Sequence, residues 1–142
     1  MTLRSRARGS RGAELVELAL ILPILLIIIA GIVDFGFMFQ AFMVVNNAAR
    51  EGARVRVLPG YSNADAIARV NSYVTASGLT GTATTAVNAI TITNGGGGAP
   101  TSNGIQVTVR YPYNFTLLGP VLAAGGVTSV MLTASSAMRS EM

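Results

Sequence analysis

The order of apolar and polar positions divides the chain into one long apolar stretch followed by shorter, alternating segments. Residues 18–33, LALILPILLIIIAGIV, contain no charge and no side-chain hydrogen-bonding group, and Leu15 and Val16 extend this run back past Glu17. A helix needs about 20 apolar residues to cross the hydrocarbon core of a bilayer. The run therefore predicts one membrane-spanning helix near the N-terminus.

The helical pattern continues beyond the apolar run. Four large side chains recur at the spacing of one helix face: Phe35, Met38, Phe39 and Phe42. An aromatic belt at the membrane interface explains this cluster, and so does a face that packs against other helices. Polarity then rises until Pro59 and Gly60 interrupt the pattern. One helix is expected from Ala13 to Leu58, about 69 Å long at about 1.5 Å per residue, with a kink at Pro23.

The remaining residues, 59–142, have the pattern of a small extracytoplasmic domain. Residues 62–78 predict a short amphipathic helix that is capped by Ser62 or Asn63, carries Ile67, Val70 and Val74 on one face, and stops at Gly78. Three segments rich in Val, Ile and Thr alternate with a period of two, at residues 82–93, 105–116 and 127–138. The expected fold is α+β: a long N-terminal hydrophobic transmembrane helix, then one short helix and a three- to four-stranded antiparallel sheet.

Charge sets the expected orientation in the membrane. Four of the ten Arg fall within the first twelve residues, where there is no acid: Arg4, Arg6, Arg8 and Arg11. Such a cluster holds the N-terminus in the cytoplasm, so a single-pass protein of the cytoplasmic membrane with its C-terminal domain outside is expected. A cleaved secretory signal peptide fits poorly because the apolar core is too long and no small-x-small cleavage pattern follows it. The basic tail lacks interleaved aromatic residues, so no nucleic-acid partner is expected.

The residue types present leave little room for catalysis. The chain has no Cys, His or Lys, so there is no disulfide, no thiolate metal site and no usual nucleophile or base. The carboxylates are scattered, and the Gly95 to Gly98 run is followed by neither a Lys nor a helix pattern, which favours a hairpin loop over a phosphate-binding loop. We expect no enzyme activity, no catalytic or metal-binding residue and no cofactor.

Glu17 is the one unusual residue, because a carboxylate at or inside the bilayer edge is costly and needs a partner. Arg11 lies outside the apolar run. If the chain were cut after Gly12, the new amino group of Ala13 would lie one helical turn before Glu17 on the same helix face. In a packed bundle, the amine of one subunit could equally neutralise Glu17 of its neighbour. The simpler alternative is that Glu17 lies at the membrane interface, has no partner and extends its carboxylate into water.

These residues carry a family resemblance. The stretch RGAELVELALILPILLIIIAGIVDFGFMF, followed by NNAAREGAR, resembles the TadE-like proteins, pseudopilins of the tight-adherence branch of type IV pili. The resemblance is strong over residues 11–58, and it divides the chain into a basic prepilin leader (1–12), a long helix (13–58) and a small domain (59–142). The sequence departs from the family pattern at Leu18, because pilins of this system often carry an aromatic residue at this position.

The resemblance implies a function and a set of partners. A prepilin peptidase would cut between Gly12 and Ala13, and Glu17 would serve processing or assembly. The expected product is a structural subunit or assembly component of a pilus or secretion filament. Its partners would be other pilin or pseudopilin subunits, with further copies of itself among the candidates, the inner-membrane assembly machinery and membrane lipid. The alternative is a permanently anchored extracytoplasmic binding domain. Such a protein would retain residues 1–12, except that Met1 could be removed.

Overall fold

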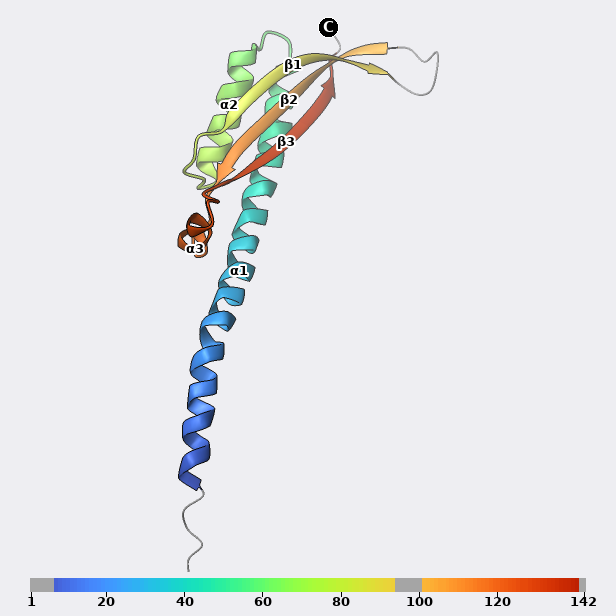
Figure 1. The fold of residues 1–142 in the computed structure, drawn as a ribbon. Helices are drawn as coiled ribbons and strands as arrows, with labels where there is room; N and C mark the ends of the chain where they lie inside the picture. Colours follow the sequence, from blue (N-terminus) through green and yellow to red (C-terminus); the bar gives the residue numbers. More distant parts are fainter. Residues whose placement is uncertain (1–6, 94–100, 141–142) are drawn as a thin grey trace, which may run out of the picture.

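The computed structural model describes residues 7–93 and 101–140, with side chains from Gly12 onward. The Gly95 to Gly98 run, Arg4, Arg6 and Glu141 therefore lie outside the described residues. The described part contains a long helix, a short helix, two strands, another short helix and a final strand: α1 (Ala7–Arg56), α2 (Asn63–Ala76), β1 (Thr84–Thr93), β2 (Thr101–Tyr113), α3 (Gly119–Ala124) and β3 (Val130–Arg139). Figure 1 shows α1 as a stalk that carries the other elements near its C-terminal end.

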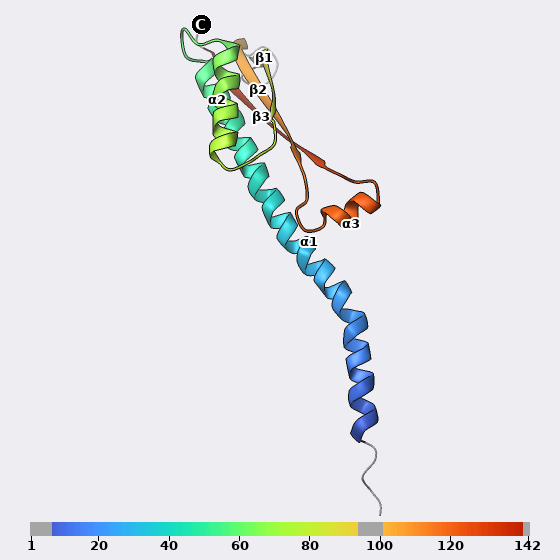
Figure 2. The same cartoon turned by 90° about the vertical axis from the view of Figure 1, so that its left-hand side faces the viewer.

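Helix α1 is 50 residues long and contains Pro23. It begins at Ala7, earlier than the expected Ala13, and ends at Arg56, two residues before the expected Leu58. The early end follows from Pro59, because a residue that precedes proline is disfavoured in the helical conformation. In Figure 2, α1 bends within its N-terminal half, the part of the chain that contains Pro23. A proline there removes one helical hydrogen bond, which explains the bend.

The three strands form one antiparallel sheet in the order β1-β2-β3. Val107 in the central strand pairs with Val87 on one side and with Ser136 on the other. The period-two pattern predicted for β2 is confirmed, since four alternating side chains are buried on one face: Ile105, Val107, Val109 and Tyr111. This face packs against α1, so the sheet lies along the C-terminal half of that helix (Figure 1).

The hydrophobic core is shared between α1 and the C-terminal domain, by which we mean residues 59–140. The contribution of α1 consists almost entirely of small side chains: Ala41, Val45, Ala48, Ala49 and Ala53. Val70 and Val74 of α2 and the buried face of the sheet complete the core. Small residues on α1 let α2 and β2 approach its backbone closely, so the C-terminal half of α1 is an integral part of the domain.

Helix α2 follows the prediction closely. Ser62 is its N-cap, and its hydroxyl accepts a hydrogen bond from the Asp65 backbone N–H at 3.3 Å while the Ser62 N–H donates to the Asp65 carboxylate at 2.8 Å. This reciprocal pair is a capping box. The hydrogen bonds from the Ser62 backbone and hydroxyl lower the pKa of Asp65. Val70 and Val74 of the predicted face are buried, whereas Ile67 is only partly covered and Ala66 is buried with them.

Helix α3 was not expected, because the sequence between the last two strands has the composition of a loop. Pro120 lies in its first turn, where the fixed φ of proline favours a helix start and the missing N–H costs nothing. The described part of the C-terminal domain thus has two short helices and three strands. The predicted α+β class, with its long apolar helix and antiparallel sheet, is confirmed.

Candidate functional site

The predicted processing residues lie within α1. Gly12 and Ala13 are both helical and exposed, and a Cβ atom built on Gly12 would meet no atom within 4 Å. Nothing in the described fold therefore requires glycine at position 12. A requirement for glycine there would have to come from a partner that binds this segment.

Glu17 is exposed on α1, four residues after Ala13. Residues separated by four positions lie on the same side of a helix, so Ala13 and Glu17 share one side of α1. Among the side chains described, Glu17 has neither a hydrogen bond nor an ion pair. Its carboxylate is thus available to a group that the intact single chain does not supply.

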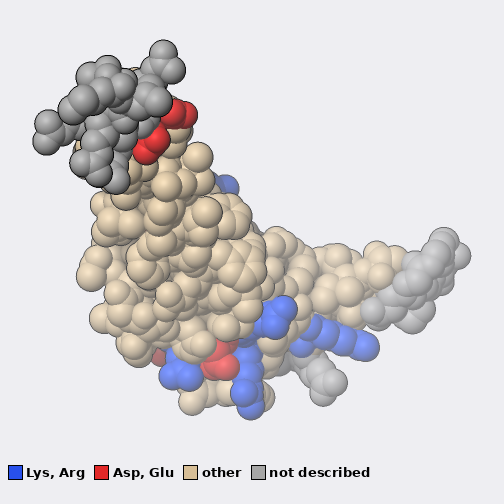
Figure 3. All heavy atoms as spheres, turned by 90° about the horizontal axis from the view of Figure 1, so that it is seen from below, with Lys and Arg blue, Asp and Glu red and all other residues tan. Residues whose placement is uncertain are grey.

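The apolar half of α1 is uncovered. By length and composition α1 can cross a membrane, and none of its most apolar stretch is buried. Large exposed side chains run along it, among them Leu20, Ile24, Ile28 and Ile32. Figure 3 shows a broad surface without charged side chains when the molecule is seen from below. A soluble monomer rarely exposes such a surface, which suggests that α1 is a single-pass membrane anchor.

The phenylalanine cluster beyond the apolar run also faces outward. Phe35, Phe39 and Phe42 remain 61%, 56% and 37% exposed, and only Met38 of the predicted face packs against the core. The C-terminal domain therefore uses a different side of α1. Both sequence-based interpretations, an aromatic belt and a surface for other helices, remain compatible with this exposure.

Asp34 is a buried carboxylate whose role the sequence analysis missed. It lies directly after the apolar run and is 0% exposed. One carboxylate oxygen accepts hydrogen bonds from the backbone N–H groups of Thr116 and Leu117, both at 3.1 Å. The other accepts from Leu117 at 3.0 Å and from Leu118 at 2.6 Å. Both oxygens act as acceptors, as in an ionised carboxylate, so Asp34 ties the β2–β3 connection to α1.

Tyr113 adds to this tie from the end of β2. Its hydroxyl donates to the backbone carbonyl of Asp34 at 3.4 Å, and its ring meets Phe115 edge to face with centroids 5.6 Å apart. Burial, together with the nearby Asp34 carboxylate, raises the pKa of Tyr113, so its hydroxyl stays protonated and remains a donor. The sequence signal for this cluster was available: a charge at the edge of a span is costly unless it is paired.

The NNAAREGAR motif forms the contact between α1 and the rest of the domain. Its small residues Ala48, Ala49, Gly52 and Ala53 are buried. A Cβ atom on Gly52 would lie 2.6 Å from Val70 Cγ2 and 3.3 Å from Val107 Cγ1. Glu51 in the same motif makes an exposed ion pair with Arg69 of α2, at 3.3 Å. This part of the motif is explained by close packing within one chain.

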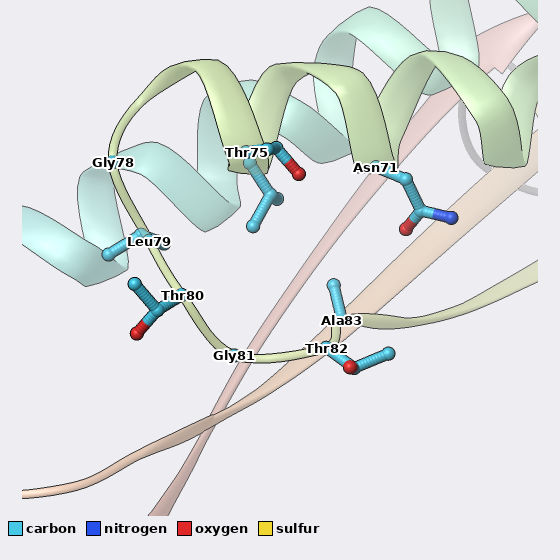
Figure 4. Close-up of a pocket in the computed structure, with 9 residues that line it drawn as sticks. Asn71, Thr75, Gly78, Leu79, Thr80, Gly81, Thr82 and Ala83 are labelled. Carbon is cyan, nitrogen blue, oxygen red and sulfur yellow. The ribbon is translucent and has the colours of Figure 1, made fainter.

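A groove of about 500 Å³ separates the C-terminal end of α2 from the segment that leads into β1 (Figure 4). Its lining contains no titratable side chain and consists of Asn71, Val74, Thr75, Gly78, Leu79, Thr80, Gly81, Thr82 and Ala83. The groove therefore offers no titratable side chain for acid–base chemistry, and its only reactive groups are threonine hydroxyls. Within the described residues there is also no cluster of three or more His, Cys, Asp or Glu that could hold a metal ion.

One exposed apolar helix that carries a small α+β domain is the architecture of a single-pass, membrane-anchored protein. A family model described as "TadE-like protein" matches residues 12–54, so the predicted TadE-like family is confirmed over this segment. The match begins at Gly12 and ends at Arg54, and it therefore contains Glu17, Asp34 and the small-residue contact around Gly52. The comparisons with curated proteins and with solved structures gave no match.

Proposed function

We propose that this chain is a non-enzymatic TadE-like pseudopilin, inserted in the cytoplasmic membrane with its N-terminus inside and cut after Gly12 by a prepilin peptidase. The observation that carries the proposal is the family match, which starts at Gly12 and runs along the exposed apolar helix. A free helical surface of this kind serves a subunit that first lies in lipid and then exchanges lipid for neighbouring helices.

Cleavage after Gly12 would change the electrostatics at the start of α1. The mature helix would begin near Ala13, which places Glu14 in its first turn and Glu17 close behind. The first N–H groups of a helix lack partners and carry partial positive charge, so carboxylates there are favourable. The new Ala13 amine adds a full positive charge on the same side as Glu17. In an assembly, this amine and the Glu17 carboxylate of the same or a neighbouring subunit form the proposed pair.

The direct experiment is the mass of the mature chain purified from membranes of cells that contain a prepilin peptidase. Loss of residues 1–12 is the expected result. A mature chain that keeps them, apart from Met1, would contradict processing and leave the permanently anchored binding domain as the function.

Orientation is checked separately with a reporter fused after Met142. Activity only outside the cytoplasm is expected, because Arg4, Arg6, Arg8 and Arg11 hold the N-terminus inside. Cytoplasmic activity would reverse the proposed topology and remove the basis for assembly outside the membrane.

A further inference from the structure

The β2–β3 connection lies beside the end of the apolar half of α1. In both ribbon views α3 hangs at the edge of the domain that faces the N-terminal part of the stalk (Figures 1 and 2). The Asp34 carboxylate holds the backbone of residues 116–118, and Leu118 Cδ1 lies 3.6 Å from the position of a Cβ on Gly31. This connection is therefore fixed at the level of the last turn of the apolar run.

The connection is uncharged and exposes large apolar side chains. No Asp, Glu, Lys or Arg occurs from Tyr111 to Met138. Leu117, Val121 and Val127 are 49%, 54% and 45% exposed. Several exposed apolar side chains on one short connection, next to an uncovered apolar helix, mark a surface that is covered in the working protein.

Helix geometry gives the depth of this surface. The roughly 20 residues from Glu14 to Val33 span about 30 Å at about 1.5 Å per residue, which matches the hydrocarbon core of a bilayer. Gly31, and Leu118 beside it, then lie at the outer boundary of the hydrocarbon. The apolar surface of residues 117–127 is thereby level with the lipid headgroups and the first part of the acyl chains.

We propose that residues 117–127, including α3, form a second membrane contact that lies in the outer lipid interface beside α1. The inference rests on the proposed insertion of α1. Lipid is the occupant because Leu118 meets α1 at Gly31, at the level where the uncovered apolar run reaches the outer boundary of the hydrocarbon. Val121 and Leu117 insert shallowly, as apolar side chains of interfacial segments do.

Asp34 is the positioning residue of this contact. Its carboxylate fixes Thr116, Leu117 and Leu118 against α1, and their N–H groups satisfy a charge that would otherwise face the membrane boundary. Two attachments, the span and the interfacial segment, hold the C-terminal domain at one tilt relative to the membrane.

The absence of Cys from the chain allows a direct test with single-cysteine variants of the full-length protein. Val121→Cys, Ala137→Cys and Ile24→Cys are labelled with a polarity-sensitive fluorophore and reconstituted in phosphatidylcholine vesicles. All three positions are exposed, so labelling leaves the core intact. Ala137 lies near the far end of β3 and is the matched control, while Ile24 reports insertion of α1. The Val121 label should show blue-shifted emission and quenching by lipids that carry a nitroxide near the headgroup, and the Ala137 label should show neither.

The outcomes separate this inference from the proposed function. A Val121 label that behaves like the Ala137 label, while the Ile24 label is quenched, overturns the interfacial contact and leaves insertion standing. An unquenched Ile24 label removes insertion and the contact together. Blue-shifted Val121 emission that depends on the protein-to-lipid ratio, without quenching from lipid, means that a second copy covers the surface, and this also overturns the proposal.

Discussion

The Asp34 carboxylate of α1 accepts a hydrogen bond from the backbone N–H of Leu118, which lies 84 residues further along the chain, at 2.6 Å. This contact joins the edge of the apolar run to the β2–β3 connection. It gives a residue inside the family match a structural role that is separate from processing and assembly. Asp34 and these N–H groups fix the β2–β3 connection against α1, in addition to the core that holds the rest of the domain on the helix.

Asp34→Ala should destabilise the β2–β3 connection, because the backbone N–H groups of residues 116–118 lose their acceptor. Leaving one buried donor unsatisfied costs about 1–3 kcal/mol. Asp34→Asn keeps one acceptor oxygen and loses the charge, so it should rank between wild type and Asp34→Ala. Amide hydrogen exchange of residues 116–118 measures the effect in the membrane-reconstituted protein. Glu51→Gln, which removes only an exposed ion pair, is the control and should leave this exchange unchanged. If the amides of residues 116–118 exchange as slowly in Asp34→Ala as in the wild type, their hydrogen bonds to Asp34 are not needed to hold the connection in place.

Gly52→Ala should destabilise the domain by about 1–3 kcal/mol through overpacking. The added methyl group would lie 2.6 Å from Val70 Cγ2. The helical backbone fixes the position of this methyl group, so it cannot move away from Val70. Gly36→Ala is the matched control, since no atom lies within 4 Å of its Cβ position on the same helix. Thermal unfolding in one detergent compares the two. Because Val70→Ala alone also removes buried packing, the clash is tested with a double-mutant cycle. Gly52→Ala should cost less stability in the Val70→Ala background than in the wild type, and an equal cost in both backgrounds would exclude the clash as the cause.

If the chain is processed after Gly12 by a peptidase whose cleft accepts only a residue without a side chain, Gly12→Leu should leave the precursor uncut. This variant tests cleavage separately from folding, since position 12 is exposed and a Cβ atom there would meet no atom within 4 Å. The fold and insertion of the variant should match the wild type. Mass spectrometry of the membrane-bound chain shows whether residues 1–12 have been removed. Normal trimming of Gly12→Leu would show that the cleavage site lies elsewhere.

Glu17→Gln and Glu17→Ala should insert at least as well as wild type and assemble poorly. Removing a carboxylate near lipid lowers the cost of insertion. In the packed assembly the Ala13 amine would lose its partner, and breaking one side of a desolvated pair costs about 3–5 kcal/mol. Gln retains hydrogen bonding and should rank between wild type and Ala. The readout is co-assembly of the cleaved variants with other pilus subunits, with Glu14→Gln as the control at a neighbouring exposed carboxylate. Equal assembly of both Glu17 variants would leave Glu17 as an interfacial residue without a partner.

Asp65 should make the stability of α2 depend on pH. Its pKa is lowered in the folded protein by the Ser62 hydrogen bonds, so its contribution is complete above its unfolded pKa of about 3.9 and is lost as the pH falls through the lower folded value. Unfolding of wild type and Asp65→Asn compared between pH 7 and pH 3 isolates this effect. The difference between the two proteins should shrink toward the acidic end, and a constant difference would contradict the capping role of the carboxylate.

Local patterns in the sequence were enough to predict the long helix, α2, the three strands and the resemblance to the TadE-like family that the family model matches over residues 12–54. The uncharged run of residues 18–33 predicts an exposed apolar helix, because a stretch without polar side chains can be stable in lipid only as a helix. The alternation around Val107 and Val109 predicts a half-buried strand, and Ser62 with Asp65 marks a helix start. Glu17 was found as a candidate because a charge beside an apolar run is visible along a single chain, whereas Gly12 as a processing site rests on the resemblance to the TadE-like proteins.

Only the tertiary structure decided which side of α1 the C-terminal domain occupies and what Asp34 does. The phenylalanine spacing and the small residues around Gly52 mark two faces of the same helix, and periodicity alone does not say which of them the domain covers. The choice follows from close approach: Val70 and Val107 fit against glycine and alanine, while Phe35 and Phe39 stay outside. Asp34 meets its donors more than 80 positions away. A contact of that separation depends on the packing of the sheet against α1, which no local pattern encodes.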